Sequence, residues 1–189
     1  MAGNASKLGI ISSALVLIGD APINSLDDAG AGAITAATLY DSSLENLMTM
    51  HRWRFAIKQG QLSRLVAAPI NDWTYQHQLP SDFLYLEKST SYNFEIFGDK
   101  VYSNDKDVTI DYGFMADESD FPAWFVKTAE YLLASEFAIP VTGNAQKAQT
   151  YNAMFEKQYK RARNLDASER PNVEMQDSPL IHTFASIRS

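Results

Sequence analysis

Histidine and cysteine are the side chains most often used for metal binding and acid–base or nucleophilic chemistry near neutral pH. The chain contains three histidines, His51, His77 and His182, and no cysteine. Disulfide bridges, thiolate metal sites and cysteine nucleophiles are therefore excluded. A metal site built on any of the histidines would need all its partners from distant segments, because no second histidine stands at helical or hairpin spacing. We interpret the three as hydrogen-bonded or solvated side chains.

An acidic cluster at Asp105, Asp107 and Asp111 resembles a calcium-binding loop at first sight. Such a loop needs glycine at its sixth position and glutamate at its twelfth, and here these positions hold Ile110 and Ala116. A turn that carries solvated carboxylates explains the cluster better.

Phosphate-binding and hydrolase motifs are missing from the sequence. The segment Gly30-Ala31-Gly32 lacks the third glycine of a nucleotide-binding loop, and no strand is predicted before it. No Gly-x-Ser-x-Gly elbow occurs. Carboxylates from distant segments could still converge for acid–base work, although their placement favours no pair. We therefore predict no catalytic, cofactor-binding or metal-binding residue, and we do not expect an enzyme.

Aromatic residues are frequent around the middle of the chain, where a base-stacking platform has to be considered. Such a platform is typically flanked by arginine and lysine, but acidic residues outnumber basic ones in this stretch. Contacts in the core or between subunits are therefore the favoured roles, and we predict them for Trp53, Phe55, Trp73, Tyr75 and Trp124.

The chain has 189 residues and a net charge of −7, with a sequence pI near 4.9. This balance argues against binding to phosphate backbones or anionic membranes, which require clustered lysine and arginine. It is compatible with DNA that passes close by without being held. No apolar run approaches the length of about 20 residues that spans a bilayer. The stretch from Leu8 to Ile18 is predicted to be a short amphipathic helix rather than a signal peptide.

Helical periodicity flanks the chain's central region. A first helix is expected from Ser6 to Ile18, and a second from Ala33 to Arg54 with Ala37 and Tyr40 on its apolar stripe. A third helix is expected to begin at Asp120 and to be closed by Pro140. A fourth follows the cap residue Asn144 and ends in basic residues that complement the helix dipole.

Alternating apolar and polar residues characterise positions 61–114. They predict short antiparallel strands, with hairpin turns at Gly98-Asp99 and Asn104-Asp105-Lys106. The expected fold class is α+β: a bundle of about four helices with an inserted small antiparallel β domain and an extended C-terminal arm. The predicted domains are residues 1–60 with 115–168 (helical), 61–114 (β) and 169–189 (arm).

The C-terminal segment 170–189 has no helical or strand periodicity. A fully extended chain of twenty residues reaches about 60 Å. Sparse bulky residues favour an arm that binds a neighbouring molecule over a disordered tail. The predicted anchors are Met175, Leu180, Ile181, Phe184, Ile187 and Arg188.

Four short sequence segments, taken in their order along the chain, resemble the tail tubular protein A family. These proteins are the head-to-tail adaptors (gatekeepers) of podovirus-type bacteriophages. The segments are the stretch from Ala14 to Leu26, the helix exit from His51 to Ala56, the segment from Tyr75 to Asp82, and Phe121-Pro122-Ala123-Trp124-Phe125. Each phrase is weak alone, and the resemblance depends on their common order across nearly the whole chain.

The resemblance implies a structural virion protein with no cofactor, located in the neck of the particle and assembled in the host cytoplasm. Copies, usually twelve, would form a ring that joins the portal protein to the tail nozzle protein and surrounds the channel used in DNA ejection. DNA would pass without specific binding, and no membrane would be involved. The arm would reach along the portal or neighbouring subunits.

Two other classes of function remain open from the residues alone. One is a cellular ligand-binding or scaffolding α+β module whose β unit holds a small molecule between aromatic side chains. The other is a hydrolase that assembles its carboxylates from distant segments, with Asp105, Asp107 and Asp111 as the best candidates.

Overall fold

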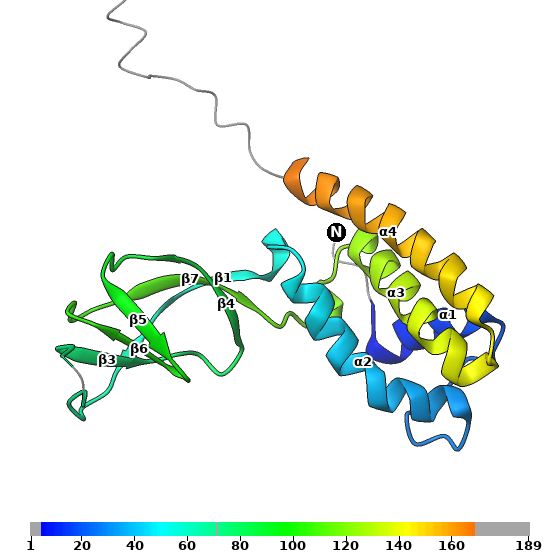
Figure 1. Cartoon of the computed structure of the whole chain (residues 1–189), viewed down its shortest axis with the longest axis horizontal. Coiled ribbons are helices and arrows are strands. Elements are labelled where there is room, and N and C mark those ends of the chain that lie inside the picture. Colours follow the sequence, from blue (N-terminus) through cyan, green and yellow to red (C-terminus); the bar gives the residue numbers. More distant parts are fainter. Residues whose placement is uncertain (1–4, 71, 169–189) are drawn as a thin grey trace, which may run out of the picture.

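A computed structural model describes residues 5–70 and 72–168 of the chain. Four helices gather at one end of an elongated molecule and seven short strands at the other (Figure 1). The expected α+β class is confirmed. The predicted arm, residues 169–189, lies outside the described residues.

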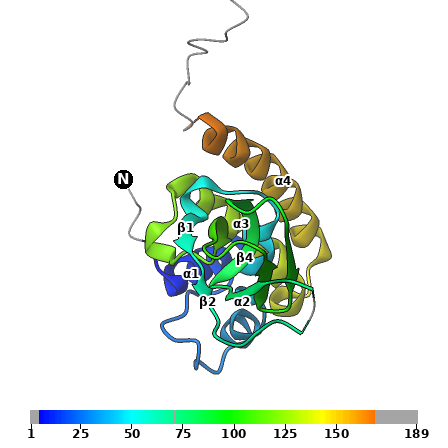
Figure 2. The same ribbon diagram turned by 90° about the vertical axis from the view of Figure 1, so that its left-hand side faces the viewer.

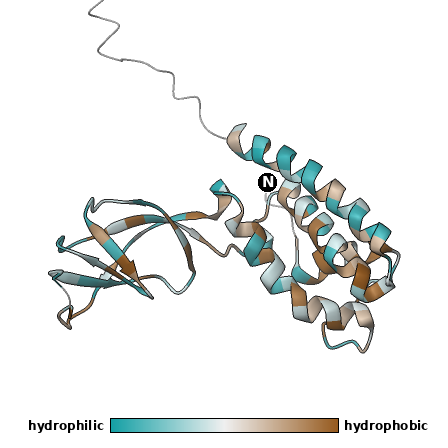
Figure 3. Cartoon of the chain, in the orientation of Figure 1, coloured by the Kyte–Doolittle hydropathy of each residue, from teal (hydrophilic) through white to brown (hydrophobic). Residues whose placement is uncertain are grey.

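The helical unit is organised around α3, which packs against all three other helices. The bounds of the helices are Lys7–Ile18 (α1), Ala31–Thr49 (α2), Ala123–Thr142 (α3) and Ala145–Ser168 (α4). As the apolar spacing predicts, α3 buries a stripe of Phe125, Ala129, Leu132, Leu133 and Phe137, and Phe121, two residues before the helix, is buried with them. The polar exposed side of α4 is visible as its hydrophilic segments in Figure 3.

The ends of α1 follow from two residues whose types suit helix caps. The Ser6 hydroxyl accepts a hydrogen bond from the backbone N–H of Gly9 at 3.1 Å. Gly19 closes the helix with a φ of 85°, which favours glycine because a Cβ would be strained there. Asn144 caps α4 in the same manner as Ser6, accepting from the Lys147 N–H at 3.0 Å.

The predicted second helix is too long at its C-terminal end. Helix α2 stops at Thr49 rather than Arg54, because the chain turns back to bury Trp53. The indole N–H of Trp53 donates to the Leu47 carbonyl at 2.9 Å and so stabilises the turn. The prediction that Ala37 lies on the buried stripe is also wrong, since Ala37 is exposed and Ala36 is buried instead.

Two expectations for the later helices are wrong. Pro140 lies inside α3, which continues to Thr142 and is closed by Gly143 with a φ of 66°. The basic residues of α4 are not at its C-terminus either: the helix runs on to Ser168, and its last turn contains no basic side chain. They lie on the exposed side of the helix instead.

The strands form two antiparallel sheets. Their bounds are Ile57–Gln61 (β1), Ser63–Arg64 (β2), Tyr75–Gln78 (β3), Phe83–Ser89 (β4), Phe94–Phe97 (β5), Lys100–Ser103 (β6) and Thr109–Phe114 (β7). The first sheet has the order β1-β7-β4 and the second β2-β3-β6-β5. The first strand begins at Ile57, so the β unit starts four positions before the predicted boundary.

A separate apolar core fills the β unit. It consists of Leu62, Leu79, Val101, Val108, Ile110 and Tyr112, which come from both sheets and the segments between them. Gly98, with a φ of 60°, forms the predicted hairpin turn between β5 and β6. The predicted hairpin at Asn104–Lys106 is wrong, because β6 and β7 belong to different sheets and this loop crosses from one sheet to the other.

The β unit is inserted between α2 and α3, and the chain enters and leaves it side by side. Strand β1 follows the 3₁₀ turn at Arg54–Ala56, and β7 leads back toward α3. These two strands are paired, with Ile57 opposite Gly113. Figure 2 views the molecule from the β end, with the strands in front of the helices.

Candidate functional site

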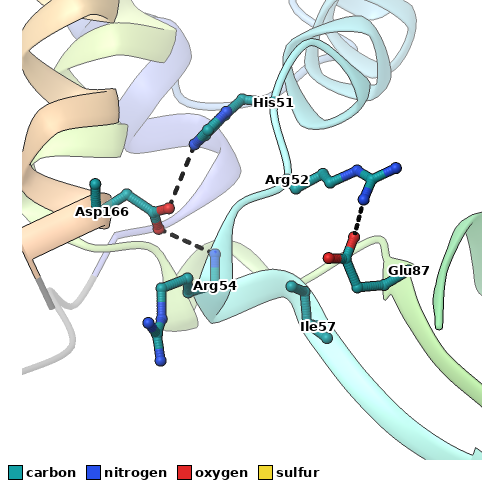
Figure 4. A pocket seen from close by; sticks show the side chains of 7 residues that line it. His51, Arg52, Arg54, Ile57, Glu87 and Asp166 are labelled. Atoms are coloured by element: carbon teal, nitrogen blue, oxygen red, sulfur yellow. Dashed lines mark hydrogen bonds and ion pairs between the residues drawn. The ribbon is translucent and has the colours of Figure 1, made fainter. Parts of the chain in front are cut away.

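A pocket of about 450 Å³ lies where the β unit meets the helical unit. We call it the junction pocket, and its lining comes from the α2–β1 connection, β4 and the end of α4 (Figure 4). The lining residues are His51, Arg52, Arg54, Ile57, Glu87, Asp166 and Ala167.

The centre of the junction pocket is Asp166, a carboxylate that is only 3% exposed. One oxygen accepts the backbone N–H of Arg54 at 3.0 Å, and the other lies 3.4 Å from Nε2 of His51. Burying a carboxylate is costly unless polar partners compensate it, and here the Arg54 amide donates a hydrogen bond while the His51 ring lies beside the second oxygen. Asp166 thus attaches the end of α4 to the chain entering the β unit.

A second ion pair on the other side of the pocket joins the helix exit to strand β4. Arg52 and Glu87 are 2.8 Å apart, with the arginine side chain largely exposed. Exposed ion pairs contribute little to stability, typically below about 1 kcal/mol. This pair therefore links the helix exit to the β unit but adds little to the stability of the molecule.

Tyr85 lies behind this ion pair and packs directly on the backbone of Gly113, its partner in the register of β4 and β7. Its hydroxyl is buried without a hydrogen-bond partner among the described residues. The nearby backbone N–H of Trp53 already donates to the His51 carbonyl at 3.0 Å. Burial, together with the Glu87 carboxylate, raises the pKa of the Tyr85 hydroxyl.

A carboxylate beside an imidazole is an arrangement that can orient a general base. Nucleophilic catalysis also needs a hydroxyl or thiol within hydrogen-bond reach of that base, and none lines the junction pocket. Asp166 is already engaged by a backbone amide. These contacts fit a structural attachment between the two units.

Exposed apolar side chains occur on both units. On the β unit they are Val66, Ile70, Tyr92, Ile96 and Phe97, and on the helical unit Leu8, Val16, Ile34, Met50, Ile139 and Met154. Scattered exposed apolar residues are common on soluble proteins, so only those that gather with their neighbours are informative.

One such gathering lies on the outward face of β5 and β6. We call it the aromatic patch and define it as Trp73, Glu95, Phe97 and Tyr102. The Trp73 indole donates to Glu95 at 3.1 Å, and the rings of Phe97 and Tyr102 meet edge-on with centroids 5.6 Å apart. Phe97 is 54% exposed.

A second gathering is a groove between α3 and α4, which we call the α3–α4 groove. It has a volume of about 520 Å³ and is lined by Tyr131, Met154, Lys157, Gln158, Arg161 and Asn164. Its lining combines the apolar side chains of Tyr131 and Met154 with the cationic side chains of Lys157 and Arg161.

The aromatic residues predicted from the sequence separate into two groups. Trp53, Phe55 and Trp124 come together at the junction, with Trp53 fully buried and its ring centroid 5.6 Å from that of Trp124. Trp73 and Tyr75 lie in the β unit, where Trp73 belongs to the aromatic patch and Tyr75 contacts Arg64.

The other predicted site residues are placed as follows. Met175, Leu180, Ile181, Phe184, Ile187 and Arg188 lie outside the described residues. Asp105 and Asp107 are exposed on the loop after β6, and Asp111 lies on β7, where it accepts a hydrogen bond from Gln59 at 2.8 Å.

Neither a metal-binding cluster nor a membrane-spanning helix occurs in the described residues. Residues 5–70 and 72–168 contain no group of three or more His, Cys, Asp or Glu side chains suited to a metal ion. Within the same ranges no helix combines the length and apolar character needed to cross a membrane.

Comparison with models of known protein families finds no match to the chain, and comparison with curated proteins finds none either. The functional conclusion therefore depends on the surfaces and contacts of this molecule and on the residue phrases of its sequence.

Proposed function

We propose that the chain is a structural virion protein, a head-to-tail adaptor whose copies form a ring between the portal and the tail nozzle of a short-tailed phage. In this role it binds proteins and performs no catalysis. The observation that carries the proposal is the presence of two unlike contact surfaces, the aromatic patch and the α3–α4 groove, on the two ends of an elongated subunit (Figure 1).

Unlike surfaces on one subunit are what a ring requires. A contact between different patches of neighbouring copies is heterologous, and it generates a closed ring whenever the rotation between copies closes. A subunit with a single self-complementary patch would instead favour a two-fold dimer.

The charge of the chain fits a channel for DNA. A net charge of −7 disfavours attachment of phosphates to the protein, so packaged DNA can slide past the wall. The sequence phrases shared with tail tubular protein A, from Ala14 to Leu26 and from Phe121 to Phe125, point to the same role.

Electron microscopy with the portal and nozzle proteins from the same genome tests the proposal. We expect the purified chain to co-sediment with portal rings and to add a ring of density between portal and nozzle. If the chain neither co-sediments with the portal nor forms a ring on it at micromolar concentration, the proposal is wrong.

A further inference from the structure

The aromatic patch joins apolar area to negative charge at an exposed hairpin. Phe97 and Glu95 alternate with the more inward-facing Phe94 and Ile96 along β5. Asp99, in the turn that follows, is exposed and adds a second carboxylate. The hairpin therefore presents an aromatic ring beside two acids and one base, since Lys100 is the register partner of Phe97, and its net charge is negative.

The α3–α4 groove has the opposite charge and a matching apolar surface. Its Met154 is 43% exposed and offers apolar area to a partner. Lys157 and Arg161, which line the groove, form no ion pair with any other residue in the described ranges. Methionine adapts its shape readily to an incoming aromatic ring.

The aromatic patch and the α3–α4 groove cannot contact each other within one molecule. The β5–β6 hairpin lies in the β unit, on the far side of the junction from α3 and α4 (Figure 1). Their union therefore needs a second copy of the chain.

We propose that the β5–β6 hairpin of one copy inserts into the α3–α4 groove of the next copy. Phe97 packs against Met154 and Tyr131. Glu95 and Asp99 lie beside Lys157 and Arg161, where complementary charge fixes the orientation of the contact. The inference rests on the proposed ring and names the surfaces that form its subunit contact.

Site-directed crosslinking tests the contact, because the chain has no cysteine of its own. Lys100→Cys, beside the hairpin turn, and Asn164→Cys, in the groove, leave the proposed contact residues unchanged. An equimolar mixture of the two variants, free or bound to portal, is treated with a short bismaleimide. We expect a crosslinked dimer in the mixture and far less with either variant alone.

The matched control is Asn152→Cys, which makes the same change at an exposed position of α4 that does not line the groove. Its mixture with Lys100→Cys should give only background crosslinking. Equal yields from Asn152→Cys and Asn164→Cys would overturn the proposed contact.

Charge exchange tests the orientation of the contact. Lys157→Glu with Arg161→Glu in the groove copy should lower crosslinking roughly tenfold, because like charges then face each other. Introducing Glu95→Lys and Asp99→Lys in the hairpin copy should restore it. The control Lys160→Glu with Arg163→Glu changes the net charge of α4 equally without altering the groove lining.

The outcomes separate this inference from the proposed function. Rings on the portal without specific crosslinking would overturn the contact and leave the adaptor role intact. Crosslinking with charge rescue, but no binding to the portal, would support the contact and contradict the adaptor role. Crosslinking that ignores the charge exchange would overturn the pairing of Glu95 and Asp99 with Lys157 and Arg161.

Discussion

At the scale of single residues, Asp166 determines how the end of α4 is fastened to the rest of the molecule. Its two oxygens serve different partners, the Arg54 amide at 3.0 Å and the His51 ring at 3.4 Å. Both partners belong to the connection 50–56, in which the chain leaves α2 and approaches the β unit.

Replacing this carboxylate should therefore cost stability in proportion to the partners lost. We expect Asp166→Ala to lower the free energy of unfolding by about 1–3 kcal/mol, since it leaves a backbone N–H without its acceptor. Asp166→Asn keeps an acceptor oxygen and should cost less. Urea unfolding of both variants checks this order, and an equal loss in the two would contradict the role given to the Arg54 amide.

Trp53 is the second residue on which the junction depends. It is fully buried, and its ring lies edge-on to that of Phe125 with centroids 5.2 Å apart. We expect Trp53→Ala to destabilise the fold by about 3–5 kcal/mol, as large aromatic truncations in a core do. The half-exposed Trp73 supplies the matched control, and Trp73→Ala should shift the denaturation midpoint much less.

The sequence allowed the burial of Trp53 to be predicted but not the role of Asp166. A tryptophan beside a phenylalanine at a helix exit is typical of core, whereas a lone aspartate near a helix end is usually solvated. One signal was present: Asp166 continues the alternating four- and three-residue spacing of Phe155, Tyr159 and Ala162 on the packed side of α4. Its partners at 51 and 54 are more than a hundred positions away, so no local pattern contains them.

At the scale of elements, strands β4 and β7 depend on Gly113, which has no side chain and so leaves room for the Tyr85 ring. A Cβ at Gly113 would come within 2.3 Å of the Tyr85 ring, closer than real contacts allow. We expect Gly113→Ala to destabilise the β unit by about 1–3 kcal/mol, because the ring must move. Gly60→Ala on the paired strand β1 is the control, since its Cβ would meet Tyr112 at an ordinary 3.4 Å.

If a clash with the Tyr85 ring causes the loss of stability in Gly113→Ala, that loss should disappear when the ring is removed. In the background of Tyr85→Ala, the further change Gly113→Ala should cost little, and a double-mutant cycle would show strong coupling. Additive losses would mean that the glycine is needed for another reason.

Sheet β1-β7-β4 also depends on one carboxylate. Asp82, just before β4, accepts hydrogen bonds from Lys58 of β1 at 3.0 Å and from Tyr112 of β7 at 3.2 Å. Partial burial raises the pKa of the Asp82 carboxyl, but the hydrogen bonds from Lys58 and Tyr112 lower it by more, so it lies below its ordinary value.

The sign of the resulting pH dependence follows from this lowered pKa. The stabilisation provided by the ionised Asp82 carboxylate is complete above the ordinary aspartate pKa. It is lost as pH falls through the pKa of Asp82 in the folded protein. We expect Asp82→Asn to lose less stability than the wild type between about pH 6 and about pH 3. Urea midpoints across that range check it, with Asp107→Asn on an exposed loop as control.

Most elements were predictable because helix caps and alternating strands are local signals. The start of α1 at Ser6, the turn at Gly98 and the cap at Asn144 illustrate this. The division of the strands into two sheets was not predictable, because it depends on which distant strands pair. The loop after β6 has the composition of a hairpin turn, and only the pairing of β7 with β1 and β4 shows that it is a crossing.

At the scale of the whole molecule, residues 5–168 contain two apolar cores. We expect these cores to keep a chain that lacks residues 170–189 folded, with a urea midpoint near that of the full chain. If the predicted anchors bind the portal, the same truncation should abolish co-sedimentation with portal rings. An undiminished yield of complete tailed particles would contradict the role proposed for the arm.

The side-by-side entry and exit of the β unit has a consequence for how such a chain can vary. Because Ile57 and Gly113 are register partners, the cut ends of the helical unit would lie within one strand spacing of each other, about 5 Å. A short glycine-serine bridge can close that gap with little loss of chain entropy. Segments of other lengths can therefore be inserted between Ile57 and Gly113. Evolution or a protein engineer can exchange the β unit in this way while leaving the helical unit unaltered.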